Sequence, residues 1–187
     1  MKIPVGVSKR HVHLNTETCI ILFGSDKIPI RNKLTQPGQY ASTLTVDLEW
    51  EGNVIEHVRV VGPIRKYNQI EVSDEECQIL GVEPPERQSG DLNGSLPINL
   101  IGPCGKVNLS NGLIKAERHI HMTEVTAEEQ NLINKEEVEV YHNNEFMFNA
   151  IIKITNPAYN ELHIDTVEEK YFNLHQNEEV EFKKCGK

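Results

Sequence analysis

Several features that would assign this chain to a large protein class are missing from its sequence. No stretch approaches the roughly 20 consecutive apolar residues that a membrane-spanning helix needs. Basic residues are not in excess: 19 lysines and arginines stand against 28 aspartates and glutamates, giving a formal net charge of -9. Because a nucleic-acid partner would favour a basic face, we expect neither a nucleic-acid nor a membrane partner.

Cysteine is scarce, and its spacing argues against a disulfide-rich protein. The four cysteines lie far apart, and no two of them form a Cys-x-x-Cys pair. This spacing implies no disulfide framework, so free thiols are expected. Residues 1–8 also lack the long apolar core of a secretory signal. We therefore expect a soluble, cytoplasmic protein.

Short β-branched or alternating runs dominate the local patterns, and turn residues separate them. The expected strands cover residues 44–50, 58–61, 137–141, 147–154 and 179–182. Helical signals are few and follow capping residues, at 16–23, 73–80 and 126–133. This pattern favours small β-barrels or sandwiches with a few capping helices over a parallel α/β sheet. The apolar-poor segment 83–95 is interpreted as a connection between two halves.

A repeated histidine motif organises the candidate chemistry. Residues 9–13 read Lys-Arg-His-Val-His, and residues 117–121 read Glu-Arg-His-Ile-His. Eight histidines in 187 residues give about 0.3 His-x-His pairs by chance, from 8 × 8/187. Two such pairs, each preceded by arginine and each followed by a small polar residue and a helical signal, therefore indicate an internal duplication.

A second internal match supplies a third candidate ligand in each half. Residues 67–74 align without gaps with residues 159–166, which places Glu71 opposite His163. Side chains at i and i+2 of a strand point to the same side, so each His-x-His pair aims two imidazoles into one space. Two sites with three protein ligands each are predicted: His11, His13 and Glu71, and His119, His121 and His163.

Three functions remain open at this point. Three protein ligands leave a coordination position free, as in catalytic metal sites. The chain is then a metal-dependent enzyme or a non-enzymatic metal-binding domain; the resemblance described below narrows the enzyme to a metal-dependent acyltransferase, with a metal-dependent thioester hydrolase as the alternative. A lone His-x-His pair is often only a surface strand, but the duplication and the third ligand favour metal binding.

Five segments carry a specific resemblance that spans nearly the whole chain in order. They are residues 5–14, 34–41, 61–65, 116–122 and 162–166, and they resemble the motifs of the PduL-type phosphotransacylases, or phosphate propanoyltransferases. The resemblance implies a mostly β fold of two small barrels related by internal duplication and capped by short helices. It implies domains at 9–116 and 117–187, with residues 1–8 packing in the second barrel and the active site at the interface.

The activity implied by the resemblance is reversible transfer of a short acyl group, propanoyl or acetyl, between coenzyme A and inorganic phosphate. It implies two divalent metal ions, usually zinc, held by the six residues named above. Arg65 matches the family's phosphate-contacting arginine. Three further positions match residues that line the family's coenzyme A site: Ser8, Lys33 and Arg59. One departure affects that site, because Lys170 stands where the family usually has an asparagine.

The resemblance also carries expectations about partners and location. The substrates would be acyl-CoA and phosphate in one direction and coenzyme A and acyl phosphate in the other, as in propanediol degradation. A homodimer is a family-level expectation. Members packaged into bacterial microcompartments carry an N-terminal amphipathic extension, which this sequence lacks. We therefore expect a cytoplasmic enzyme, with packaging through a partner left open.

Overall fold

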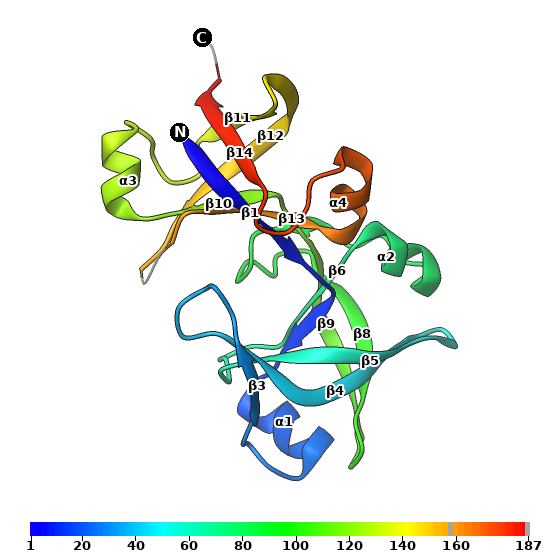
Figure 1. Cartoon of the computed structure of the whole chain (residues 1–187). Coiled ribbons are helices and arrows are strands. Elements are labelled where there is room, and N and C mark those ends of the chain that lie inside the picture. The colour runs from blue at the N-terminus through cyan, green and yellow to red at the C-terminus, as the bar shows by residue number, and fades with distance from the viewer. Residues whose placement is uncertain (157–158, 186–187) are drawn as a thin grey trace. The chain divides into compact units, whose positions relative to one another are not determined.

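A computed structural model describes residues 1–156 and 159–185 of the chain, and strands dominate it (Figure 1). The chain forms two compact units: Lys9–Ala116 is the first barrel, and Met1–Ser8 with Glu117–Lys187 is the second barrel. The prediction of a mostly β fold with two small barrels and a few short helices is confirmed. No helix in the described ranges is long and apolar enough to cross a membrane.

The first barrel closes through six strands. Its elements are β2 (His11–His13), α1 (Thr16–Phe23), β3 (Ile30–Lys33), β4 (Tyr40–Trp50), β5 (Asn53–Gly62), β6 (Gln69–Val72), α2 (Asp74–Leu80), β7 (Glu86–Arg87), β8 (Leu96–Ile101) and β9 (Lys106–Ala116). The strand order is β4, β5, β2, β6, β9 and β8, and β8 also pairs with β4. β3 and β7 add to the outside of this ring by pairing with β4 and β9.

The second barrel is also closed. Its elements are β1 (Lys2–Ser8), β10 (His119–Met122), α3 (Glu124–Glu129), β11 (Glu137–His142), β12 (Glu145–Ile154), β13 (Glu161–Asp165), α4 (Thr166–Phe172) and β14 (Glu179–Lys184). The strand order is β1, β13, β10, β12, β11 and β14, and β14 returns to β1. Closure pairs the backbone groups that an open sheet would leave at its edges.

Both barrels repeat one pairing pattern around a His-x-His strand. β2 runs parallel to β5 and antiparallel to β6, and β10 runs parallel to β12 and antiparallel to β13. The strand that precedes each His-x-His strand in the chain belongs to the other barrel. β1, which precedes β2, pairs with β13 and β14, while β9, which precedes β10, pairs with β6 and β8.

The helices agree with the capping signals in most places. Asn15 caps α1, and its side chain accepts a hydrogen bond from the backbone of Thr18. The expected helix at 126–133 is shifted, because the N-cap is Thr123 and α3 ends at Glu129. Helix α4 was not predicted, although Asp165 and the residue three positions later form a capping box at its start.

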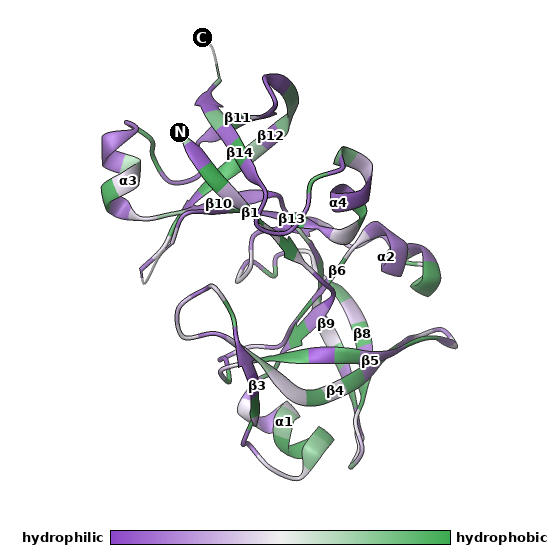
Figure 2. Ribbon diagram, viewed as in Figure 1, coloured by the Kyte–Doolittle hydropathy of each residue, from purple (hydrophilic) through white to green (hydrophobic). Residues whose placement is uncertain are grey.

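Each barrel has its own hydrophobic core. Figure 2 shows hydrophobic segments alternating with hydrophilic ones along the strands. Along β12 the buried side chains are Phe148, Ala150 and Ile152, two positions apart, as expected for a strand with one face toward the core. In β9 Leu113 is fully buried and belongs to the core of the first barrel.

We expect Leu113→Ala to lower the free energy of unfolding by about 2–5 kcal/mol, because it removes a buried side chain and leaves a cavity. Leu113 is 0% exposed, whereas Leu34 is 39% exposed. The matched control Leu34→Ala should therefore change stability by no more than about 0.5 kcal/mol. Denaturant titration of both variants measures the difference. Equal effects would show that β9 contributes little to the core.

Candidate metal centres

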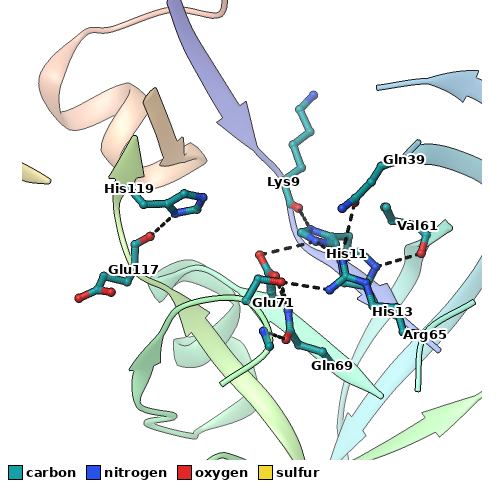
Figure 3. A network of polar contacts seen from close by, with 12 residues as sticks. Lys9, His11, His13, Gln39, Val61, Arg65, Gln69, Glu71, Glu117 and His119 are labelled. Carbon is teal, nitrogen blue, oxygen red and sulfur yellow. Dashed lines mark hydrogen bonds and ion pairs between the residues drawn. The ribbon is translucent and has the colours of Figure 1, made fainter. Parts of the chain in front are cut away.

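In the first barrel the predicted ligands gather at the pairing of β2 with β6. His11 lies directly opposite Glu71 in the antiparallel register, and His13 lies two residues along β2. Nε2 of His11 is 3.2 Å from Nε2 of His13 and 3.6 Å from Oε2 of Glu71. One ligand atom from each of the three residues lies within 4.8 Å of the others. We call this group the first cluster (Figure 3).

Backbone carbonyls fix how the two imidazoles of the first cluster face. Nδ1 of His11 donates to the carbonyl oxygen of Lys9 at 2.8 Å, and Nδ1 of His13 donates to that of Val61 at 3.0 Å. A carbonyl oxygen only accepts, so each Nδ1 carries a proton. In the neutral form of each ring the lone pair is then on Nε2, and the two Nε2 atoms face each other inside the cluster (Figure 3).

The carboxylate of the first cluster is also held. Nε2 of Gln69 donates to Oε1 of Glu71 at 2.5 Å. Gln69 is fully buried, and its own oxygen accepts from the backbone of Gly90 at 2.7 Å. Its amide nitrogen also contacts Oγ of Ser89 at 2.8 Å. The side chain that orients Glu71 is therefore fixed by a loop distant in sequence.

In the second barrel the other three predicted ligands gather in the same way. His119 lies opposite His163 in the register of β10 and β13. Nε2 of His119 is 3.1 Å from Nε2 of His121, and the ring of His163 lies 5.1 and 4.7 Å from theirs, centroid to centroid. The three residues again offer ligand atoms within 4.8 Å of one another. We call this group the second cluster.

His119 and His121 of the second cluster make different contacts with their surroundings. Nδ1 of His119 donates to the carbonyl oxygen of Glu117 at 2.7 Å, which repeats the arrangement of the first cluster (Figure 3). The ring of His121 stacks on Tyr159 at 4.9 Å. Among the described residues, Nδ1 of His121 is a buried polar atom without a hydrogen-bond partner. Such atoms are rare in folded proteins, and a bound water or ion is one explanation for them.

Burial keeps two of these rings neutral. It lowers the pKa of His119 well below its usual range, with smaller contributions from the charges of His163, Lys153 and His121. Burial, followed by the charges of His163 and Lys153, lowers the pKa of His121 to about 3. A lowered histidine pKa means that the ring is neutral at neutral pH, with a proton on only one of its two nitrogens. Both rings can therefore offer a lone pair to a metal without first losing a proton.

Two neighbours contact the remaining ring of the second cluster. Nε2 of His163 lies 2.7 Å from Oε2 of Glu161 and 2.9 Å from the hydroxyl of Tyr159. Glu161 is 3% exposed. Burial, the charge of Glu161 and the hydrogen bond to it raise the pKa of Tyr159, so this hydroxyl keeps its proton. Neither contact was anticipated, although the two-residue spacing of Glu161 and His163 places both on one face of β13.

Arg65, the predicted phosphate contact, lies in the first barrel within a polar network. Its Nη1 donates to the hydroxyl of Tyr67 at 3.2 Å and to Oγ of Ser89 at 3.1 Å. Its Nη2 donates to Oε1 of Gln39 at 3.4 Å. These three partners were not identified as site residues, since single polar residues at long sequence separation carry no periodic signal. Gln39 does lie within one of the motifs that carry the family resemblance.

The segment 83–95 is not a connection between two halves. It lies inside the first barrel, where Glu86–Arg87 forms β7 and pairs with β9. Ser89 contacts both Arg65 and Gln69. Hydrogen bonds that join Ser89 and Gly90 to Arg65 and Gln69 hold this segment against the barrel.

The three residues expected at the coenzyme A site fall in both units. Lys33 lies at the end of β3, exposed to solvent. Arg59 lies on β5 opposite His11, and its Nη1 donates to the carbonyl oxygens of Ser42 and its neighbour at 3.2 and 3.1 Å. Ser8 ends β1 in the second barrel. Their role in binding coenzyme A stays a prediction.

Comparisons with known proteins support a single family. The sequence profile of the phosphate propanoyltransferase family matches residues 4–175. A phosphate propanoyltransferase of Rhodobacter capsulatus is 40% identical over 186 residues, which are 97% of this chain and 86% of the relative. One from Rhodopseudomonas palustris is 40% identical over 171 residues, covering 89% and 76%. One from Thermotoga maritima is 42% identical over 170 residues, covering 88% and 80%. The chain therefore belongs to the phosphate propanoyltransferase family.

Proposed function

We propose that the chain transfers a short acyl group, propanoyl or acetyl, reversibly between coenzyme A and inorganic phosphate at a site that uses two divalent metal ions. The observation that carries the proposal is the pair of matching three-residue clusters in a chain of this family. The proposal extends to this chain the acyl transfer to phosphate that the relatives' names describe.

The residues of both clusters fit a metal ion. Each cluster offers three protein donor atoms within 4.8 Å of one another, as three-ligand catalytic zinc sites do. Hydrogen bonds from Nδ1 to backbone carbonyls orient His11, His13 and His119, and such contacts are typical of metal-binding histidines.

Zinc is the ion that we propose, because it suits both three imidazole nitrogens and two imidazole nitrogens with one carboxylate. The sites would be His11, His13 and Glu71 in the first barrel and His119, His121 and His163 in the second. When bound, such ions supply Lewis-acid polarisation of a carbonyl oxygen and stabilise a thiolate at neutral pH.

The chain's own residues then have distinct tasks. Arg65 would bind the phosphate through its planar guanidinium, which matches two phosphate oxygens. Tyr67 and Ser89 hold that guanidinium in place. In the reaction a phosphate oxygen attacks the thioester carbonyl carbon, a carbon–oxygen bond forms, and the carbon–sulfur bond breaks. The sulfur leaves with the electron pair as coenzyme A thiolate, and the proton that hydrogen phosphate loses goes to that thiolate or to water. No acyl-enzyme is needed.

Three further residues would bind coenzyme A. Lys33 and Arg59 carry positive charge suited to the cofactor's phosphates, and Ser8 offers a hydroxyl. Within the part of the chain that the structure describes, the carbonyl contacts of Arg59 are made through Nη1. These assignments rest on the family match of the three positions.

Thiol release tests the proposal directly. We expect release of coenzyme A from acetyl-CoA and propanoyl-CoA only when phosphate is present, with loss on chelation and recovery when zinc or cobalt is added. The comparison of the two substrates ranks the acyl groups. Release without phosphate would indicate a thioester hydrolase instead. No release from fully metal-loaded protein would indicate a metal-binding domain.

A further inference from the structure

The two clusters differ in where their carboxylate lies. In the first barrel the residue opposite the first histidine of the motif is Glu71, and the residue two positions before it is Gln69. In the second barrel the equivalent positions are His163 and Glu161. In β6 the carboxylate stands at the ligand position. In β13 it stands two residues earlier, at a position next to the ligand.

In both barrels the residue two positions before the third candidate ligand contacts the side chain of that ligand. In the first barrel Gln69 bonds to the carboxylate of Glu71. In the second barrel Oε2 of Glu161 lies 2.7 Å from Nε2 of His163. Among the described residues, Glu161 is not a member of the group whose ligand atoms lie within 4.8 Å of one another. It therefore contacts the ligand rather than completing the set of ligands.

The contact determines which nitrogen of His163 is free. A carboxylate oxygen only accepts, so Nε2 carries the proton and donates it. The lone pair is then on Nδ1, which makes Nδ1 the nitrogen available to an ion. A carboxylate behind a metal-binding imidazole orients the ring and strengthens it as a donor, and loss of such a partner typically costs about 10- to 100-fold in metal affinity.

A glycine makes room for this carboxylate. Gly6 of β1 pairs with His163, and a Cβ added at Gly6 would lie 2.7 Å from both Cδ and Oε2 of Glu161. In the first barrel the strand equivalent to β1 is β9, where Ile114 pairs with Glu71 and is fully buried. The first cluster therefore has the isoleucine Ile114 at this position. The second cluster has Gly6, which leaves space for the carboxylate of Glu161.

From these contacts we infer that Glu161 is the positioning carboxylate of the second cluster, seated over Gly6, where it orients His163 and offsets the charge of an ion held by three neutral imidazoles. The inference deepens the proposed function, since it concerns the second of the two metal sites. It also gives Gly6 a role in metal affinity, although β1 contributes none of the proposed ligands.

The test measures metal affinity rather than turnover. Full-length protein carrying His11→Ala, which disables the first cluster, is stripped of metal and titrated with Zn²⁺ against a chelator of known affinity. We expect Glu161→Gln to weaken binding by about 10- to 100-fold, because it removes the charge and keeps the shape. Glu139→Gln removes the same charge from a carboxylate that bonds to Tyr141, and it should leave affinity unchanged.

Gly6→Ala supplies a second, independent readout. It should weaken Zn²⁺ binding as Glu161→Gln does, because the displaced group is the end of a flexible side chain and the barrel can stay folded. In a Glu161→Ala background the same substitution should have no effect on affinity. The Co²⁺ absorption spectrum should change in Glu161→Gln and stay unchanged in Glu139→Gln, which a merely structural role would not produce.

Two results would overturn the inference, and they differ in what else they affect. Wild-type affinity in Glu161→Gln, with metal bound, would remove Glu161 from this role and leave the proposed function intact. Absence of metal at the second cluster in the His11→Ala parent protein would contradict both the inference and the second metal site of the proposed function.

Discussion

His119→Ala and His163→Ala are each expected to reduce phosphate-dependent thiol release by at least about 100-fold while the second barrel remains folded. Loss of a residue that only supports a ligand already costs about 10- to 100-fold, and loss of one of three ligands should exceed it. Initial rates with saturating acyl-CoA and phosphate measure the effect, and bound metal per chain is determined alongside.

The matched control for these variants is His175→Ala. His175 belongs to the same unit, and its side chain is 67% exposed. The control should keep near-normal turnover and metal content. Near-normal activity in His119→Ala or His163→Ala would remove that residue from the metal site, and equal losses in all three variants would indicate a general effect of removing histidine.

Arg65→Ala should raise the KM for phosphate by about 10- to 150-fold, because hydrogen bonds to a charged group contribute about 1.5–3 kcal/mol. The KM for acyl-CoA should change little, since the guanidinium is assigned to phosphate alone. Arg65→Lys should recover part of the loss, because a lysine keeps the charge but not the planar pair of donors. Steady-state kinetics with each substrate varied in turn separates these effects.

Arg87→Ala is the control for Arg65. Arg87 also lies in the first barrel and also bonds through its guanidinium, to the carbonyl oxygens of Asn93 and Glu86. We expect its KM for phosphate to match that of the unaltered protein. A KM for phosphate that is unchanged in Arg65→Ala would contradict the assignment, and a rise in both arginine variants would indicate a loss of charge rather than of a specific contact.

The clusters could be predicted because the His-x-His motif and the internal match are each contained in a few consecutive residues. His-x-His spacing puts two side chains on one face of a strand, and the internal match then aligned Glu71 with His163. The structure pairs these two residues with His11 and His119 across adjacent strands. Whether they bind metal is the prediction that the experiments above address.

The polar supports of the clusters could not be predicted in the same way. Ser89 contacts Arg65 across 24 residues of sequence, and Gly6 meets a carboxylate 155 positions away, since 161 − 6 = 155. Contacts of this kind depend on how the barrel closes, and no local pattern encodes them. Glu161 is an intermediate case. Its two-residue spacing from His163 was visible in the sequence, but its position beside Gly6 was not.

The placement of β1 has a consequence for the order in which the chain can fold during synthesis. The barrel formed by Lys9–Ala116 is one continuous segment, so all of its strands are available before the second half is made. β1 is synthesised earlier still, yet Lys2 pairs with Glu181 and Val5 pairs with Leu162. β1 must therefore wait until both β13 and β14 have been made, a contact order that favours slow closure of the second barrel.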